Sequence, residues 1–169
     1  MSALVRVVSL PTVLVALAGC AEQPTSDAAS RSGPLQGVWS VVSVDASDAS
    51  VIDPSQPGLY IFAASHYSAV YTPGPNPRVK SVTSFLPTPD EMVAQYQTII
   101  VNSGSYEVDG SSFTLRPMIA KSPGFVGGYL TGTYSLSGDT LVLRHEHLFD
   151  LEGAELPDFE EILTLVRIE

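Results

Sequence analysis

Two ten-residue segments carry the same pattern, and this repeat constrains the fold more than any other feature of the chain. Residues 106–115 (YEVDGSSFTL) and 134–143 (YSLSGDTLVL) both read apolar–polar–apolar, then a glycine-containing turn, then apolar–polar–apolar. Alternation with a period of two is typical of a β-strand that buries one face. Asp109-Gly110 supplies residues that tolerate the positive φ angles of a tight hairpin turn. The repeat therefore predicts two successive β-hairpins.

The expected pairing across these turns places Tyr106 opposite Phe113 and Tyr134 opposite Leu141. Two hairpins with the same in/out register form an antiparallel meander. Other segments rich in β-branched and aromatic residues extend it. They span residues 37–45, 58–63, 67–72, 79–85 and 161–168, with 79–85 expected at an edge because Pro73, Pro75 and Pro77 precede it.

One helix is expected between the strands. Thr88-Pro89-Asp90-Glu91 is a capping box with proline in the first turn. Helical spacing then places Met92, Val93, Tyr96, Ile99 and Ile100 on one apolar face, and Asn102 and Gly104 are expected to end the helix. We expect this face to lie on the sheet as a lid or a plug.

An antiparallel sheet of this size has to protect its edges, and closure removes them. The fold class expected is all-β with one amphipathic helix between strands, in a closed antiparallel barrel of about eight to ten strands. A two-layer sandwich is the competing arrangement, and the meander favours the barrel. An eight-stranded barrel leaves an interior that can hold one small ligand.

Gly37-Val38-Trp39 on the first expected strand resembles the Gly-x-Trp signature of lipocalins and related calycins. That resemblance implies that Trp39 closes one barrel end and that Arg167, near the last strand, packs over it. A larger match is to bacterial lipocalin-like domain proteins, and it covers nearly all of residues 35–168. The matching stretches are Gly58–Phe62, His66–Ser68, Asn102–Val108, Pro117 and Ala120–Pro123.

The N-terminus has the order of a secretory signal. Arg6 is followed by an apolar stretch, residues 7–18, which is too short to span a bilayer. Leu17-Ala18-Gly19-Cys20 resembles the lipobox of bacterial lipoproteins, which implies removal of residues 1–19 and lipidation of Cys20. The resemblance also implies a bacterial cell-envelope location. Ala21, rather than aspartate, after the cysteine favours the periplasmic face of the outer membrane.

The domain organisation follows from this reading. Residues 20–34 contain no large apolar side chain, so they are expected to form a lipidated flexible tether. Residues 35–169 are expected to form the lipocalin-like barrel domain. A formal net charge of −10 argues against a nucleic-acid partner and against a polybasic grip on lipid. Membrane attachment is therefore expected through the N-terminal lipid alone, and the oligomeric state is left open.

The candidate ligand-binding residues are inward-facing aromatic and apolar side chains of the expected strands. Seven tyrosines in so short a chain suit a cavity with a few orienting hydroxyls, although ordinary barrel packing also explains them. The residues expected to line the cavity are Tyr60, Phe62, Tyr67, Tyr71, Tyr106, Phe113, Tyr134, Leu141 and His145.

His145-Glu146-His147 places two imidazoles at i and i+2, on one face of a regular strand. Such a pair could bind a transition metal with a third ligand from an acidic loop. A solvated strand end that leads into a charged loop is the favoured explanation of the pair, and we expect neither a metal nor another cofactor. The candidate loop acids are Asp150, Glu152, Glu155 and Asp158.

The function expected is binding of a small, mostly hydrophobic molecule inside the barrel, without catalytic residues. The chain has no Gly-x-Ser-x-Gly, phosphate-loop or His-Glu-x-x-His motif. One alternative is a cofactor-independent isomerase or cyclase that uses a tyrosine with His145 or Arg144. The other is a filled barrel that serves as an interaction module.

Overall fold

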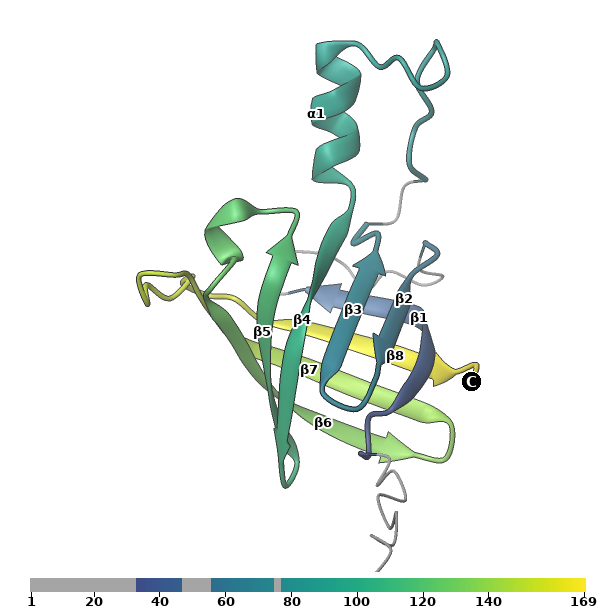
Figure 1. The fold of residues 1–169 in the computed structure, drawn as a ribbon. Helices are drawn as coiled ribbons and strands as arrows, with labels where there is room; N and C mark the ends of the chain where they lie inside the picture. The colour runs from purple at the N-terminus through teal and green to yellow at the C-terminus, as the bar shows by residue number, and fades with distance from the viewer. Residues whose placement is uncertain (1–32, 47–55, 75–76) are drawn as a thin grey trace, which may run out of the picture.

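Eight antiparallel strands form a closed barrel in the computed structural model, which describes residues 33–46, 56–74 and 77–169 (Figure 1). Neighbours along the chain pair in order, and β1 closes the barrel on β8. This arrangement confirms the predicted all-β, lipocalin-like fold class. The strands are β1 (Gly37–Ala46), β2 (Leu59–Phe62), β3 (His66–Tyr71), β4 (Ile100–Asp109), β5 (Ser112–Ala120), β6 (Tyr129–Ser137), β7 (Thr140–Phe149) and β8 (Glu161–Arg167). Cys20 and the segments predicted to be the signal and the tether, up to residue 32, lie outside the described residues.

The two predicted hairpins are present, but each pairs in a different register from the one expected. Tyr106 pairs with Leu115, and Tyr134 pairs with Leu143. The two-residue turn begins at the glycine itself, and Gly110 has a φ of 59°. Each strand is therefore shifted by two residues against its partner. An even shift keeps every side chain on its expected face, because the side-chain period of a strand is two.

The repeat also contains a β-bulge at equivalent positions. Met118 is the extra residue of β5 opposite β4, and Glu146 is the extra residue of β7 opposite β6. A glycine faces each bulge, Gly104 on β4 and Gly132 on β6. A Cβ at either glycine would collide with the backbone of the neighbouring strand. These two glycines allow the strands to approach closely where the bulges bend the sheet.

One end of the barrel, the floor, is closed by Trp39. Its indole is fully buried, and its Nε1–H donates a hydrogen bond to the Leu35 carbonyl at 2.8 Å. The Arg167 guanidinium lies over the ring with its Cζ 4.0 Å from the centroid, and it donates through Nη1 to the Gln36 carbonyl. This cation–π contact ties the start of β1 to the end of β8.

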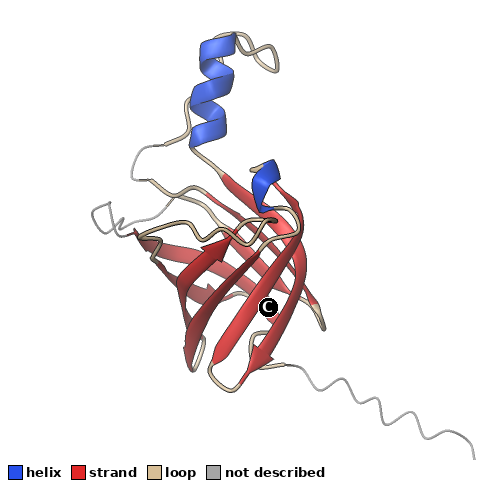
Figure 2. Cartoon of the chain, turned by 90° about the vertical axis from the view of Figure 1, so that its left-hand side faces the viewer, coloured by secondary structure: helices blue, strands red, loops and turns tan. Residues whose placement is uncertain are grey.

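The helix differs from the prediction. α1 (Pro89–Gln97) begins with the expected capping box at Thr88, but it ends before Ile99, and Ile100 and Asn102 belong to β4. No α1 residue is buried, and Met92, Val93 and Tyr96 are at least half exposed. The helix projects beyond the barrel rather than lying on it (Figures 1 and 2). The predicted strand at 79–85 is also absent, and residues 82–85 form a bend and a turn.

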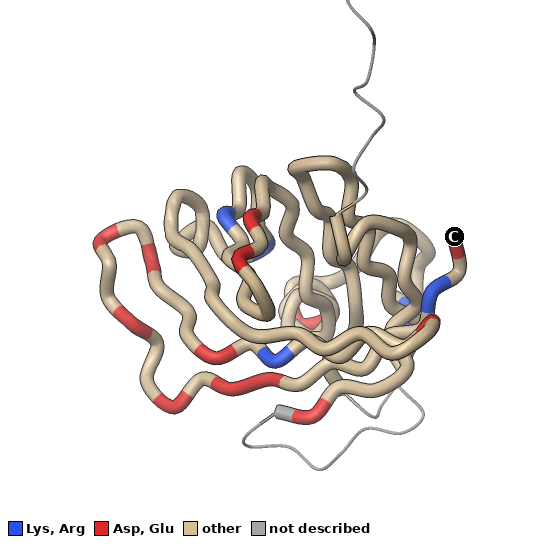
Figure 3. The backbone as a smooth tube through the Cα atoms, turned by 90° about the horizontal axis from the view of Figure 1, so that it is seen from below, with Lys and Arg blue, Asp and Glu red and all other residues tan. Residues whose placement is uncertain are grey.

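The loops at the end opposite the floor, called the open end below, carry much of the acidic charge. α1, the 3₁₀ helix η1 (Pro123–Phe125) and the loop between β7 and β8 all lie at this end. Figure 3 shows acidic residues along that last loop. None of the described helices is long and apolar enough to cross a membrane.

Candidate functional site

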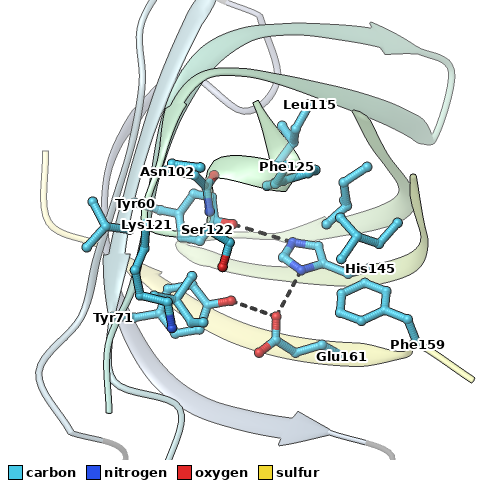
Figure 4. Close-up of a pocket in the computed structure, with 15 residues that line it drawn as sticks. Tyr60, Tyr71, Asn102, Leu115, Lys121, Ser122, Phe125, His145, Phe159 and Glu161 are labelled. Carbon is cyan, nitrogen blue, oxygen red and sulfur yellow. Dashed lines mark hydrogen bonds and ion pairs between the residues drawn. The ribbon is translucent and has the colours of Figure 1, made fainter. Parts of the chain in front are cut away.

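A cavity of about 170 Å³ lies inside the open half of the barrel (Figure 4). The lower half, toward the floor, is packed by buried side chains such as Phe62, Phe113 and Leu165. Above them, the cavity is walled mostly by apolar groups. These are contributed by β4 to β7, η1 and the β7–β8 loop, and they include Ile100, Leu115, Phe125, Leu130, Leu148 and Phe159.

Four polar side chains from four strands face this cavity together, and we call them the carboxylate cluster. They are Tyr60 on β2, Tyr71 on β3, His145 on β7 and Glu161 on β8, and all four residues are buried. Strand alternation places them inward. On β8, for example, Glu161 shares its face with the buried Leu163 and Leu165.

Glu161 is the centre of the cluster. Its Oε2 atom accepts a hydrogen bond from the Tyr71 hydroxyl at 2.6 Å and lies 3.0 Å from His145 Nδ1. A carboxyl group inside an apolar barrel is costly unless such partners replace its hydration. The 2.6 Å distance is typical of an O–H group bonded to an ionised carboxylate. The carboxylate therefore accepts two donors at one oxygen.

This arrangement determines the tautomer of His145. Because Nδ1 faces the carboxylate, it carries the proton and donates to Glu161. Nε2 is then left with a lone pair, and the nearest polar atom is the Tyr60 hydroxyl at 3.5 Å, at the limit of hydrogen-bond distance. Edge-on packing against the Phe113 ring, 5.8 Å between centroids, holds the imidazole in this orientation.

The hydroxyls of Tyr60 and Tyr71 remain protonated. Burial raises the pKa of each well above the ordinary tyrosine value, and the nearby Glu161 charge raises it further because a phenolate would repel a carboxylate. Burial also raises the pKa of Tyr67. The two cavity tyrosines therefore serve as neutral hydrogen-bond donors.

Two buried polar atoms have no hydrogen-bond partner among the described residues. One is Asn102 Oδ1, whose side chain borders the cavity, and the other is the Tyr67 hydroxyl, which lies deeper among the packed rings. Buried polar groups without partners are rare because each one loses its hydration without replacement. The Asn102 oxygen is therefore an unused acceptor at the cavity.

The rim of the cavity is formed by Lys121, Ser122 and Phe125. The Lys121 ammonium lies 4.8 Å from the centre of the Tyr96 ring. Phe125 also borders a second hollow of about 360 Å³, which reaches Phe149 and Leu156. The η1 segment thus separates the inner cavity from an outer depression.

The structure brings three of the nine predicted lining residues to the cavity: Tyr60, Tyr71 and His145. Five others are buried in the packed core without bordering it, namely Phe62, Tyr67, Tyr106, Phe113 and Leu141. Tyr134 packs at the edge of the core and donates its hydroxyl to the Gly110 carbonyl at 3.0 Å.

The two histidines of β7 do not share a face, contrary to the expectation from a regular strand. His145 faces inward in phase with Leu141 and Leu143, and the bulge at Glu146 leaves His147 more than half exposed, paired with Glu155 at 2.7 Å. In the loop, Asp150 accepts a hydrogen bond from the Ala154 amide. Among the described residues, no three His, Cys, Asp or Glu side chains are grouped closely enough to hold a metal ion.

Sequence reasoning missed Glu161 and Asn102 as site residues. Glu161 alternates with Leu163 and Leu165, and an acid in phase with two core leucines is a usable signal for an inward carboxylate. Asn102 is in phase with Gly104 and Tyr106 in the same way, but it was assigned to the end of the helix.

A comparison with protein-family models gives no match for this chain, and no curated protein is significantly similar to it. The site is therefore interpreted from its own geometry.

The hydroxyls of Tyr71 and Tyr67 differ in their hydrogen bonding, and this difference predicts unequal effects of their removal on stability. Tyr71→Phe removes a donor from the buried carboxylate and should lower the free energy of unfolding by about 2 kcal/mol. Tyr67→Phe removes a hydroxyl that has no partner and should be neutral or stabilising. Urea unfolding at pH 7 measures both, and an equal loss in the two variants would contradict the hydrogen-bond assignment.

The raised pKa of Tyr67 also predicts how Tyr67→Phe responds to alkali. Since the folded pKa of Tyr67 lies above the unfolded value of about 10, its stabilising contribution is complete below pH 10. It is lost as the pH rises toward the folded pKa. Tyr67→Phe should therefore reduce the decline in unfolding free energy above pH 10 by about 1.4 kcal/mol per pH unit. A decline as steep as in the wild type would contradict the raised pKa.

Proposed function

We propose that this protein is a lipid-anchored, lipocalin-like protein of the bacterial cell envelope that binds a small, mostly apolar molecule in its barrel. The observation that carries the proposal is the open-end cavity, in which apolar side chains surround a fixed group of polar atoms. Small-molecule sites commonly combine an apolar wall with a few placed polar groups.

The binding energy would come from burial of apolar ligand surface, at about 25 cal/mol per Å². Tyr60 and His145 would orient the ligand, because their polar atoms face the cavity and are held by rigid strands. The open space argues against the filled-barrel alternative, since packed side chains occupy only the floor half of the interior.

Filling the cavity tests this proposal. Ala120 borders it, so Ala120→Phe should exclude the ligand, whereas Val70→Phe changes a 40% exposed residue of β3 that does not border it and should not. Native mass spectrometry after mild extraction should show a co-purified ligand in the wild type and in Val70→Phe. Its presence in Ala120→Phe, or an empty wild-type protein that also fails to bind added small apolar molecules, would contradict the proposal.

The anchor is proposed from the lipobox-like run that ends at Cys20. The described chain begins at Gly33 beside the floor, at the end of the barrel opposite α1 (Figure 1). A lipid attached before this point would leave the open end facing away from the membrane, accessible to a ligand. The outer membrane is the proposed location because no aspartate follows the cysteine.

Cys20→Ser should move the protein from the membrane fraction to the soluble fraction, because the acyl chains are the proposed source of attachment. Fractionation of cells that express the wild type and the variant measures this. A variant that stays in the membrane pellet after a high-salt wash would contradict the lipid anchor.

The cluster also favours a second candidate function, cofactor-independent acid–base catalysis. Glu161 holds His145 with its Nε2 lone pair toward the cavity, and Tyr60 adds a protonated hydroxyl nearby. An imidazole oriented by a carboxylate is a suitable general base when its proton-accepting atom faces a substrate. A bound molecule with an acidic C–H group would be its substrate.

The general base can be tested with nitroethane, a neutral molecule small enough for the cavity, which loses one carbon-bound proton to a base. In D2O the lost proton is replaced by deuterium, and NMR measures the rate of this exchange. The wild type should exceed His145→Phe in rate by at least about a hundredfold. If the wild type and His145→Phe have the same circular dichroism spectrum and equal rates, the catalytic function is contradicted. Ligand binding without catalysis then remains the proposed function.

A further inference from the structure

Most of the unused polar capacity of the cavity is made of acceptors. Tyr71 O–H and His145 Nδ1–H are both committed to Glu161 Oε2. What remains is Glu161 Oε1, which takes part in neither bond, the pair His145 Nε2 and Tyr60 hydroxyl, joined by one long contact, and Asn102 Oδ1, with no partner among the described residues. Asn102 and His145 border the cavity from opposite sides (Figure 4). A ligand that complements these atoms must donate a hydrogen bond.

The charges around the cavity favour a neutral ligand. An anionic ligand would meet the Glu161 carboxylate and two further acceptor atoms. A cationic ligand could reach only the remaining carboxylate oxygen, Oε1, because Oε2 is already bonded to two donors, and it would enter past the Lys121 ammonium. Desolvating a charge without full compensation is costly, so a neutral ligand is favoured over either ion.

The volume sets the size of the ligand. An apolar cavity of about 150 Å³ holds one benzene molecule, and sites for drug-sized ligands begin at about 300 Å³. At about 170 Å³, this cavity fits a single ring with one or two small substituents. The rings of Phe125, Phe159 and Tyr60 provide aromatic walls against which such a ring can pack.

We propose that the ligand is a neutral single-ring molecule with a hydroxyl group, a phenol or a cyclic alcohol, whose O–H donates to Asn102 Oδ1. This inference rests on the proposed function, since it specifies the ligand of the same cavity. Asn102 then acts as a specificity-determining residue.

Four para-substituted toluenes test the ligand class. They are p-cresol, p-xylene, 4-methylbenzoate and 4-methylbenzylamine, titrated into the full chain by isothermal calorimetry or ligand-observed NMR. We expect p-cresol to bind at least about tenfold more tightly than p-xylene, the gain of one buried hydrogen bond, and the two ions to bind more weakly than p-cresol. Equal affinities for p-cresol and p-xylene, or preference for either ion, would overturn the inference.

Asn102→Leu tests whether Asn102 accepts the hydrogen bond from the ligand hydroxyl. The substitution removes the acceptor and keeps a side chain of similar volume. It should reduce the preference for p-cresol over p-xylene about tenfold. Binding of p-xylene shows whether the cavity is intact in the variant. Asn102→Ala makes the same test if the leucine variant does not fold. The control is Ser103→Leu, because Ser103 bonds to Ser68 and does not border the cavity. An unchanged preference in the Asn102 variants would overturn the assignment.

The results separate this inference from the proposed function. If p-xylene and p-cresol bind equally in the wild type and neither binds Ala120→Phe, the cavity is a ligand site and the ligand class is wrong. If none of the four probes binds, the ligand class is also wrong. The native mass spectra of the wild type and Ala120→Phe then decide the proposed function independently.

Discussion

A carboxylate inside an apolar barrel is the constraint on which the open half of this structure depends. Glu161 can remain buried only because Tyr71 and His145 reach the same oxygen from β3 and β7, on two sides of the barrel. The partners in turn become fixed, since a tyrosine that donates to a carboxylate stays protonated and an imidazole beside it keeps one tautomer. One buried charge therefore orders two side chains and presents a defined set of polar atoms to the cavity.

The packing of the rest of the barrel places the cavity and the buried carboxylate in its open half. The Trp39–Arg167 contact and the packed rings above it close the floor, so the free space is confined to the opposite end. The bulge at Glu146 changes the phase of β7 just beyond His145. Without that change His147 would also point inward, and a second imidazole would occupy the space that Leu148 now borders.

The sequence predicted the features that follow from periodicity and missed those that follow from tertiary packing. Alternating residues in the two repeated segments were sufficient for the hairpins, the meander and the closed barrel. The exact turn position was not predictable in this way, because Asp109-Gly110 and Gly110-Ser111 both suit a two-residue turn. The outward projection of α1 was missed because an amphipathic pattern does not show whether a surface is available to cover it.

The site was predictable to a smaller extent. Tyr60, Tyr71 and His145 were identified by their inward phase, but the same phase selected core residues such as Phe62 and Leu141. Periodicity gives the face of a residue and not its height along the barrel axis. Strand tilt and stagger set that height, and they separate the residues that border the cavity from those that fill the floor.

The tautomer of His145 tests the central claim most directly. Nitrogen-15 NMR of the histidine side chains at pH 8 distinguishes a protonated ring nitrogen from one with a lone pair. The structure predicts that His145 carries its proton on Nδ1 and that Glu161→Leu, which removes the acceptor, disturbs this state. A wild-type His145 that is protonated on Nε2, or one whose state is unaffected by Glu161→Leu, would contradict the claim that the buried carboxylate organises the site.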